Sequence, residues 1–492
     1  MRKFALPLSV FACAFLFALF PLTDTDIWWH LACAREWVTT WTPVRSPVVN
    51  VHEYFQQVVY AVYSIGGAPL LVVFKAFLWG LVFALFQDFA GLRDRSAVKP
   101  VALSVAAFYL FLFRFQLEMR PVVFTLLFLG VYWNVLPWLF ARLVSGDRCA
   151  AERAKTCLVA VTLLLLQWLW CKFQGLYILG PLFALLCLAH TLYKNRPVQQ
   201  KRQMVVPAVF VTLLFAMPFL HSEGLRLFLY PFGLLDRLLG ITPSATIFAS
   251  EIAENRSPLT LIMAGENVLA SAIMIVVAIL ALVYPLVNLF KSRRDFVLDV
   301  SLSVTAVLAL VAERNFVLLL PLFVAELCSS RQRIIRISDS VHNSSMMRVS
   351  SVVLVAFLLG LWAKSFTAYD RHMVAYQRVP VDAAAWMKSH PHKGRLFNDD
   401  RAGGYLAFVN PADSTYIDGR FILKTADFFE RYMRYSEDPA LFLADAASSG
   451  IDRAVFPLQY YARWGKVLAA LDASPEWQIA YVDAYFIVFA RK

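Results

Sequence analysis

The most constraining feature of this chain is a series of eleven apolar runs, separated by short polar segments, within its first 366 residues. Several reach the roughly 18 consecutive apolar residues that cross a bilayer as a helix. Hydrophobic residues make up 60% of the chain and charged residues 16%, whereas soluble domains have about half and about a quarter. The sequence therefore predicts a polytopic α-helical membrane protein. The predicted spans are 4–22, 69–88, 97–114, 121–140, 157–173, 175–193, 204–220, 266–290, 296–312, 315–328 and 349–366.

The net charge of +12 comes from Lys and Arg side chains that gather in alternate connections between these runs. Because cytoplasmic loops carry an excess of Lys and Arg, this alternation predicts a cytoplasmic N-terminus and an extracytoplasmic C-terminus in the plasma (inner) membrane. It also accounts for the positive charge without a nucleic-acid partner. The predicted inner loops are 89–96, 141–156, 194–203, 291–295 and 329–348.

The pattern divides the chain into a transmembrane domain, 1–366, and an extracytoplasmic soluble domain, 367–492, which has no run that could span a bilayer. Two outer loops of the first domain are long, 23–68 and 221–264. In the first loop, aromatic residues on one face and polar residues on the other predict helices that lie in the membrane interface. These two helices are Asp26 to Trp41 and Glu53 to Ile65.

Short β-type runs alternate with helical patterns after residue 366, which predicts an α/β domain. The predicted strands are 394–397, 414–417, 451–456 and 484–489, and the predicted helices are 381–387, 426–435 and 441–447.

Two acids, Asp24 and Asp26, follow the first span directly. One interpretation is structural, because an aspartate favours the N-terminus of a helix and Asp26 would cap one. The other is chemical, because a carboxylate at the bilayer surface can act as a general base on an acceptor hydroxyl. Glu53, next to His52, opens the second loop helix and adds a third acid to the same outer surface.

Cationic side chains stand at the outer ends of other spans, among them Arg120, Lys172 and Arg314. Such side chains often reach from a helix end to the interface, or pair with a neighbouring acid, without any further role. Converging on one face, they would also neutralise a phosphate, to which arginine offers two parallel hydrogen bonds.

The C-terminal domain contains two polar, glycine-bearing segments, 397–405 and 416–420, each predicted as a turn after a strand. Turns of this kind occur at ligand-binding edges, although turn chemistry alone explains them as well. No nucleotide-binding or hydrolase motif occurs in a sequence context that would support that function. The seven cysteines show no ligand spacing, so they predict no metal site.

Together these residues resemble bacterial GT-C type membrane glycosyltransferases, with short matches spread over the whole chain. The matching residues are Asp26-Ile27-Trp28-Trp29-His30-Leu31, His52-Glu53, Gly66-Gly67, Arg120-Pro121, Trp170 to Gly175, Tyr230-Pro231-Phe232-Gly233, Glu313-Arg314-Asn315, Asn398-Asp399, Gly403-Gly404-Tyr405 and Ile417-Asp418-Gly419-Arg420. The chain departs from the family at Lys172 and Gln174, where relatives often carry Asn and His.

The resemblance implies an inverting transferase that takes a sugar from a polyprenyl-phosphate donor at the extracytoplasmic face, with membrane lipids around it and an acceptor that the sequence leaves unknown. On this basis Asp26 is the candidate base, supported by Asp24 or Glu53. The implied substrate-binding residues are His30, His52, Arg120, Lys172, Gln174, Arg314, Asp418 and Arg420. No cofactor follows from the motifs, and a divalent metal stays an open alternative without support.

Two other functions fit a multi-pass protein. A transporter or flippase for lipid-linked or anionic solutes predicts charges in the middle of spans and internal repeats. Mid-span charge is sparse here, with Lys75 the main exception, and no repeat is apparent. A non-enzymatic envelope assembly protein would use its outer domain for partners and would not need Asp24 or Asp26.

Overall fold

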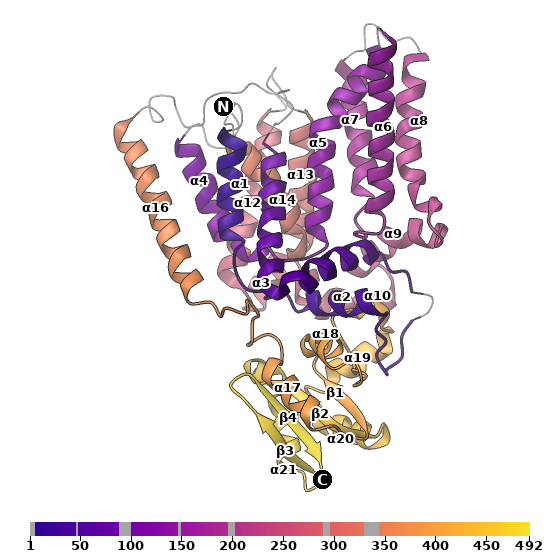
Figure 1. Ribbon diagram of the computed structural model, residues 1–492, viewed down its shortest axis with the longest axis vertical. Coiled ribbons are helices and arrows are strands. Elements are labelled where there is room, and N and C mark those ends of the chain that lie inside the picture. The colour runs from indigo at the N-terminus through magenta and orange to yellow at the C-terminus, as the bar shows by residue number, and fades with distance from the viewer. Residues whose placement is uncertain are drawn as a thin grey trace.

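The computed structural model describes residues 5–45, 48–87, 100–145, 149–194, 202–288, 296–328 and 344–492. A bundle of helices forms one layer, and a small sheet domain lies beyond one end of it (Figure 1). The amino end of α1 is at the opposite end of the bundle from this domain (Figure 1). The long bundle helices are α1 (Ala5–Phe17), α3 (Glu53–Leu85), α4 (Pro100–Leu112), α5 (Val122–Ser145), α6 (Ala150–Trp170), α7 (Leu179–Lys194), α8 (Arg202–Ala216), α12 (Val268–Asn288), α13 (Phe296–Val311), α14 (Phe316–Cys328) and α16 (Ser345–Thr367).

Each of the eleven predicted spans coincides with one of these helices, and the protein is a multi-pass membrane protein. Within the described part of the chain, five helices are long and apolar enough to cross a membrane. The number is six if the helical segments Val205–Leu220 and Leu225–Leu239 form one bent span. Others, such as α1 and α4, are apolar but shorter. The count of eleven therefore stays a prediction. The basic loops 89–96 and 291–295 lie outside the described residues, as do most of 194–203 and 329–348.

The first outer loop forms helices where the sequence predicts them, but with different ends. Helix α2 (Asp26–Arg35) stops before Trp41. Helix α3 begins at Glu53 and continues past Ile65 into the membrane span, with a kink where Gly66 and Gly67 leave helical geometry. Gly67 has φ +62°, a left-handed conformation that glycine adopts without strain. The first part of α3 therefore lies across the end of the bundle (Figure 1).

The second outer loop is also helical. It contains α9 (Leu225–Leu239), α10 (Pro243–Glu251), the short helix η5 (Ala253–Asn255) and α11 (Pro258–Met263).

The C-terminal domain is α/β, with four strands in the order β1-β2-β4-β3. Strands β1 and β2 are parallel, and the other two pairs are antiparallel. The strands are β1 (Arg395–Asn398), β2 (Ile451–Pro457), β3 (Trp477–Val482) and β4 (Phe486–Arg491). The helices are α17 (Val381–Ser389), α18 (Asp400–Val409), α19 (Ala426–Arg434), α20 (Pro439–Ser448) and α21 (Tyr461–Ala473).

Two predictions for this domain were wrong. Residues 414–417 form no strand, because the side chain of Asn398 takes the hydrogen bonds that a sheet would need. Its Oδ1 accepts from the N–H of Tyr416 at 2.8 Å and its Nδ2 donates to the carbonyl of Ile417 at 2.7 Å. The glycines at 403 and 404 are not in a turn but inside α18, which Asp399 caps by accepting from the N–H of Arg401.

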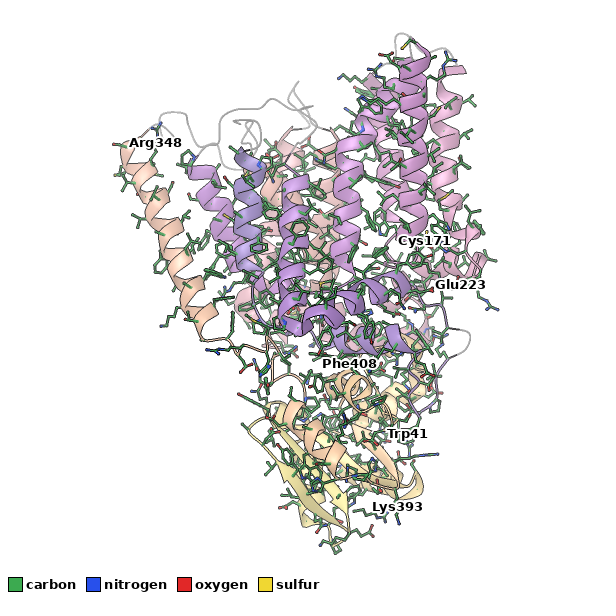
Figure 2. The ribbon with its side chains drawn as sticks, in the orientation of Figure 1. Trp41, Cys171, Glu223, Arg348, Lys393 and Phe408 are labelled. Atoms are coloured by element: carbon green, nitrogen blue, oxygen red, sulfur yellow. The ribbon has the colours of Figure 1, made fainter. Side chains whose placement is uncertain are left out.

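Helix α18 of the C-terminal domain packs against α2 of the first outer loop. The ring of Trp28 on α2 meets that of Tyr405 edge-on, with centroids 4.8 Å apart. Arg35 donates to the carbonyl of Phe408, which Figure 2 places at this junction. Gly404 allows the close approach, since a Cβ there would lie 3.0 Å from the backbone nitrogen of Trp29. One apolar core runs from the bundle into this domain. The division of the chain into a domain of residues 1–366 and a domain of residues 367–492 remains our proposal.

Candidate functional site

Three charged side chains from distant segments meet beside the start of α2. Arg120, just before α5, donates to Asp24 Oδ1 at 3.0 Å and to both carboxylate oxygens of Glu254 at 2.8 and 2.9 Å. Asp24 is almost fully buried, and its other oxygen, Oδ2, has no hydrogen-bond partner among the described residues. Arg120 lowers the pKa of Glu254 to about 2, although burial acts in the opposite direction. The cluster therefore holds two carboxyl groups around one guanidinium, which keeps Glu254 ionised.

Asp26 lies next to this cluster, in the first turn of α2. Burial raises the pKa of its carboxyl from 3.8 to about 7, the charge of Asp24 adds to the rise, and Arg120 opposes it. Asp26 does not cap α2, because Thr25 holds the capping position and the nearby backbone contact, Asp26 N–H to Asp24 Oδ1, spans 3.5 Å. A carboxyl that titrates near neutral pH suits general acid–base chemistry.

A turn from the C-terminal domain covers Asp26. A Cβ on Gly419 would lie 1.9 Å from Asp26 Oδ1, so the two segments are in direct contact. On either side of the glycine, Arg420 pairs with Asp418 through bonds of 2.5 and 2.9 Å, and this guanidinium holds the pKa of Asp418 below its usual range. The turn covers part of Asp26, which stays half-buried, and the charges of Asp418 and Arg420 are satisfied by each other.

We expect Gly419→Ala to lower activity about tenfold or more, because the added methyl must displace either the turn or the carboxyl of Asp26. Turnover of the purified protein measures this effect. Gly233→Ala is the matched control, since nothing lies within 4 Å of a Cβ at that position on α9. Equal activity of the two variants would contradict the covering role of the turn.

His30 and His52 line the same region, with their ring centroids 5.3 Å apart. Burial lowers the pKa of His52 to about 4 and brings that of His30 well below its ordinary value. The charge of Arg420, and to a smaller extent that of Arg120, also lowers the pKa of His30, and Arg314 acts in the same direction on His52. Both rings are therefore neutral at pH 7 and can offer hydrogen bonds without charge.

Arg314 differs from the other candidate cations. It follows α13 in the short helix η6 (Glu313–Asn315), is exposed, and donates to Asn255 Oδ1 at 3.1 Å. Asn255 is the neighbour of Glu254, so Arg314 lies at the edge of the Asp24–Arg120 cluster. Within the described ranges no carboxylate pairs with Arg314. Its positive charge is therefore available to an anionic ligand.

Lys172 and Glu53 lie together, apart from Asp26. The Lys172 ammonium is 3.2 Å from Glu53 Oε2 and also pairs with Glu223, which Figure 2 labels at the far side of the bundle from α16. Two acids thus already neutralise Lys172. Gln174 accepts a hydrogen bond from the backbone N–H of Leu176 at 2.8 Å. The structure therefore gives Glu53, Lys172 and Gln174 local partners and does not bring them to the Asp26 cluster.

Glu254 is the participant that the sequence analysis missed. The only signal for it was an acidic stretch, 251–256, in the second outer loop. Among the described residues, no group of three or more His, Cys, Asp or Glu side chains could hold a metal ion.

The fold of this chain is similar to that of solved oligosaccharyltransferases, a GT-C type fold, as the resemblance of its motifs predicts. A similar structure is the archaeal oligosaccharyltransferase AglB from Archaeoglobus fulgidus in complex with an inhibitory peptide and a dolichol-phosphate, with a TM-score of 0.54 and 12% identity over 95% of this chain and 72% of that one. Its complex with Zn and sulfate gives 0.53 and 12% over 98% and 73%. ArnT from Cupriavidus metallidurans bound to undecaprenyl phosphate gives 0.48 and 12% over 99% and 97%. No protein-family model and no curated protein sequence matches the chain.

Proposed function

We propose that this protein is an inverting glycosyltransferase that moves a sugar from a polyprenyl-phosphate donor to an acceptor at the extracytoplasmic face of the inner membrane. The observation that carries the proposal is the site itself. Burial raises the pKa of the Asp26 carboxyl to about 7, and this carboxyl adjoins a cluster at whose edge lies Arg314, a cation that no carboxylate pairs with in the part of the chain that the structure describes. The likeness to AglB, which binds a dolichol-phosphate, supports the same donor class here.

In the proposed reaction, Asp26 accepts the proton of the acceptor nucleophile while that nucleophile attacks the anomeric carbon of the sugar. A new bond forms to this carbon, and its bond to the phosphate oxygen breaks on the opposite face, which inverts the configuration. The polyprenyl phosphate leaves with the bonding electrons. Arg314 stabilises the developing charge on the phosphate, and the turn around Gly419 keeps water from competing with the acceptor.

The donor phosphate would lie beside Arg314. The charge of Arg314 acts on His52 and on Tyr230 of α9, so a neutral ring and a hydroxyl lie near the same cation. An isoprenoid phosphate arrives laterally with its phosphate at headgroup depth. The loops that follow the spans, which carry Asp26 and Arg314, reach this depth. We propose that the N-terminus is cytoplasmic and that this site and residues 367–492 are extracytoplasmic.

Undecaprenyl phosphate binding to the full-length protein in nanodiscs tests the phosphate site. We expect Arg314→Gln to weaken binding about tenfold or more, because the ligand loses its charge-assisted hydrogen bonds. Arg142→Gln is the matched control, since Arg142 pairs with Glu152 at 3.3 Å in a predicted inner loop. Equal weakening by both substitutions, or none by Arg314→Gln, would contradict this assignment.

Sugar transfer distinguishes the proposal from its alternatives. Membranes that contain the protein should transfer sugar from a polyprenyl-phosphate donor, and Asp26→Asn should lower this transfer about 10³-fold and change the cell-surface glycan. A transporter would move its solute whether or not Asp26 can ionise. An assembly protein would tolerate the substitution. Retained transfer or an unchanged surface glycan in a folded Asp26→Asn variant would refute the glycosyltransferase.

A further inference from the structure

Helix α9 carries an apolar face that the described part of the chain leaves uncovered. The apolar side chains on this face are spaced three or four residues apart, so they form one stripe along the helix. Each of them is between 44% and 59% exposed. They are Leu225, Leu229, Phe232, Leu235 and Leu239. Contiguous exposed apolar surface of this kind marks a site for an apolar partner.

The surface next to the stripe indicates that this partner is the lipid bilayer. Helix α8 is a predicted span, and apolar side chains are exposed along it and in the segment that leads into α9. The chain turns by 101° between the two helices, so α9 runs along the plane of the membrane where α8 crosses it. Figure 1 shows α9 at the end of the bundle that is nearer to the C-terminal domain. The exposed side chains before α9 include Val205, Val209, Leu213, Phe219 and Leu220.

The opposite face of α9 packs against the protein. Leu227 has no exposed surface, and its carbonyl accepts a hydrogen bond from the hydroxyl of Tyr177, which precedes α7. A Cβ on Gly175 would lie 2.7 Å from the ring of Tyr230, so these two segments are in close contact. One side of α9 is therefore fixed to the segment between α6 and α7, and the stripe on its other side is left for lipid.

The carboxyl end of α9 reaches the C-terminal domain. Arg237 donates to the carbonyl of Phe421 at 3.3 Å, two residues after the glycine that contacts Asp26. The Arg237 guanidinium also lies over the ring of Phe248 on α10, 4.5 Å from its centroid. Phe248 is buried and stacks on Phe429 of α19, with ring centroids 5.0 Å apart. The helix that carries the apolar stripe therefore also holds the turn beside the candidate base.

We propose that the apolar stripe of α9 docks into the acyl chains of the bilayer leaflet nearer to the C-terminal domain, and that α9 thereby anchors the turn 418–421 at the membrane surface. Bilayer phospholipids are the occupant because the stripe is a convex helix face that continues the exposed apolar surface of α8. Arg226, the exposed residue next to Leu225, suits a lipid phosphate at headgroup depth. The inference rests on the proposed function only for its consequence at Asp26.

Photolabelling of the full-length protein in nanodiscs tests the docking. The probe is a phosphatidylcholine with a diazirine on one acyl chain, and mass spectrometry locates the labelled residues. We expect the stripe to take up about five times or more the label of β3, whose Ile479 and Val482 are similarly exposed but lie in the C-terminal domain. Equal labelling of α9 and β3 would overturn the docking. Loss of the α9 label on adding undecaprenyl phosphate, in an amount equal to the protein, would assign the stripe to the isoprenoid tail and would also overturn it.

Hydrogen exchange tests the anchoring, at the amide of Lys424 that donates to the Phe421 carbonyl at 2.9 Å. Phe232→Asp puts a charge into the stripe, so it should lower the α9 label and accelerate this exchange about fivefold or more. Arg237→Met should accelerate the exchange as much while it keeps the label, because only the bond to Phe421 is lost. Val482→Asp, a charge added to the exposed surface of β3, is the matched control and should change neither quantity.

The outcomes separate this inference from the proposed function. Wild-type exchange at Lys424 in both Phe232→Asp and Arg237→Met would overturn the anchoring. The label and the exchange are measured without sugar transfer. A labelled α9 with the expected exchange, in a protein that transfers no sugar even as wild type, would therefore overturn the proposed function and leave the docking standing.

Discussion

Replacing Asp26 by asparagine is expected to lower kcat for sugar transfer about 10³-fold at pH 8, within the range that general base catalysis contributes. Asparagine keeps the size and some of the hydrogen bonds of the carboxyl but cannot accept the proton of the nucleophile. Binding of undecaprenyl phosphate, which we assign to Arg314, should change little. Turnover and lipid binding measured on the same preparation separate the two effects.

The pH profile of the wild type gives an independent signature of Asp26. Because burial raises the pKa of this carboxyl to about 7, the base is protonated and inactive below that pH. Turnover should therefore rise roughly tenfold per pH unit up to about pH 7 and level off above it. The residual turnover of Asp26→Asn should not show this rise with pH.

The stability of the folded protein should fall as pH rises over the range in which turnover increases. The folded protein binds the Asp26 proton more tightly than the unfolded chain does, so this group lowers stability as pH rises from about 4 to about 7. Asparagine removes the penalty. We expect the Tm of Asp26→Asn at pH 8 to equal or exceed that of the wild type, while Asp472→Asn, an exposed acid on α21, changes neither Tm nor turnover. A lower Tm together with lost activity would point to a structural role for Asp26.

Replacing Arg120 by methionine is expected to lower both transfer and stability. Asp24 and Glu254 would then lose the guanidinium that bonds both of them, a change that costs about 3–5 kcal/mol for a fully buried pair. The Arg120 side chain is 32% exposed, so we expect a smaller loss of about 2 kcal/mol. Transfer should fall about 100-fold, because repulsion between the two acids displaces the start of α2.

The pH dependence of this loss has a definite sign. In the wild type, Arg120 holds the pKa of Glu254 at about 2, so the stability that this acid contributes is present above pH 4.5 and is lost only as pH falls toward 2. Without the arginine, ionised Glu254 keeps only the weaker effects of Arg314 and Arg378 against the charge of Asp24. The loss of Tm in Arg120→Met should therefore be larger at pH 8 than at pH 5.

A double variant separates charge balance from chemistry. Arg120→Met combined with Glu254→Gln should regain much of the lost Tm, since one repelling acid is gone. Transfer should stay low, because Asp24 still lacks its partner. Thermal unfolding and turnover at pH 8 measure both quantities. Full recovery of transfer would show that Arg120 serves only to neutralise Glu254.

Much of the fold could be predicted because its signals are local. A long apolar run predicts a helix wherever it folds, and each predicted span coincides with a helix. The predicted end of α2 was wrong because its aromatic pattern continues to Trp41 while the helix stops at Arg35. The predicted strand at 414–417 failed because the side chain of Asn398 binds the backbone there. Such a competition cannot be read from the pattern of residues 414–417 alone.

The sequence by itself determined that this protein crosses a membrane many times, that two acids follow its first span, and that an α/β domain follows the last. These follow from composition and order within short windows. Only the tertiary structure decided that Arg314 has no carboxylate partner among the described residues, that Glu254 meets Arg120 from 134 residues away, and that Gly419 contacts Asp26. Charge pairing and burial depend on distances of a few ångströms between segments that the chain order leaves far apart, and these distances set the pKa of Asp26 and the availability of Arg314.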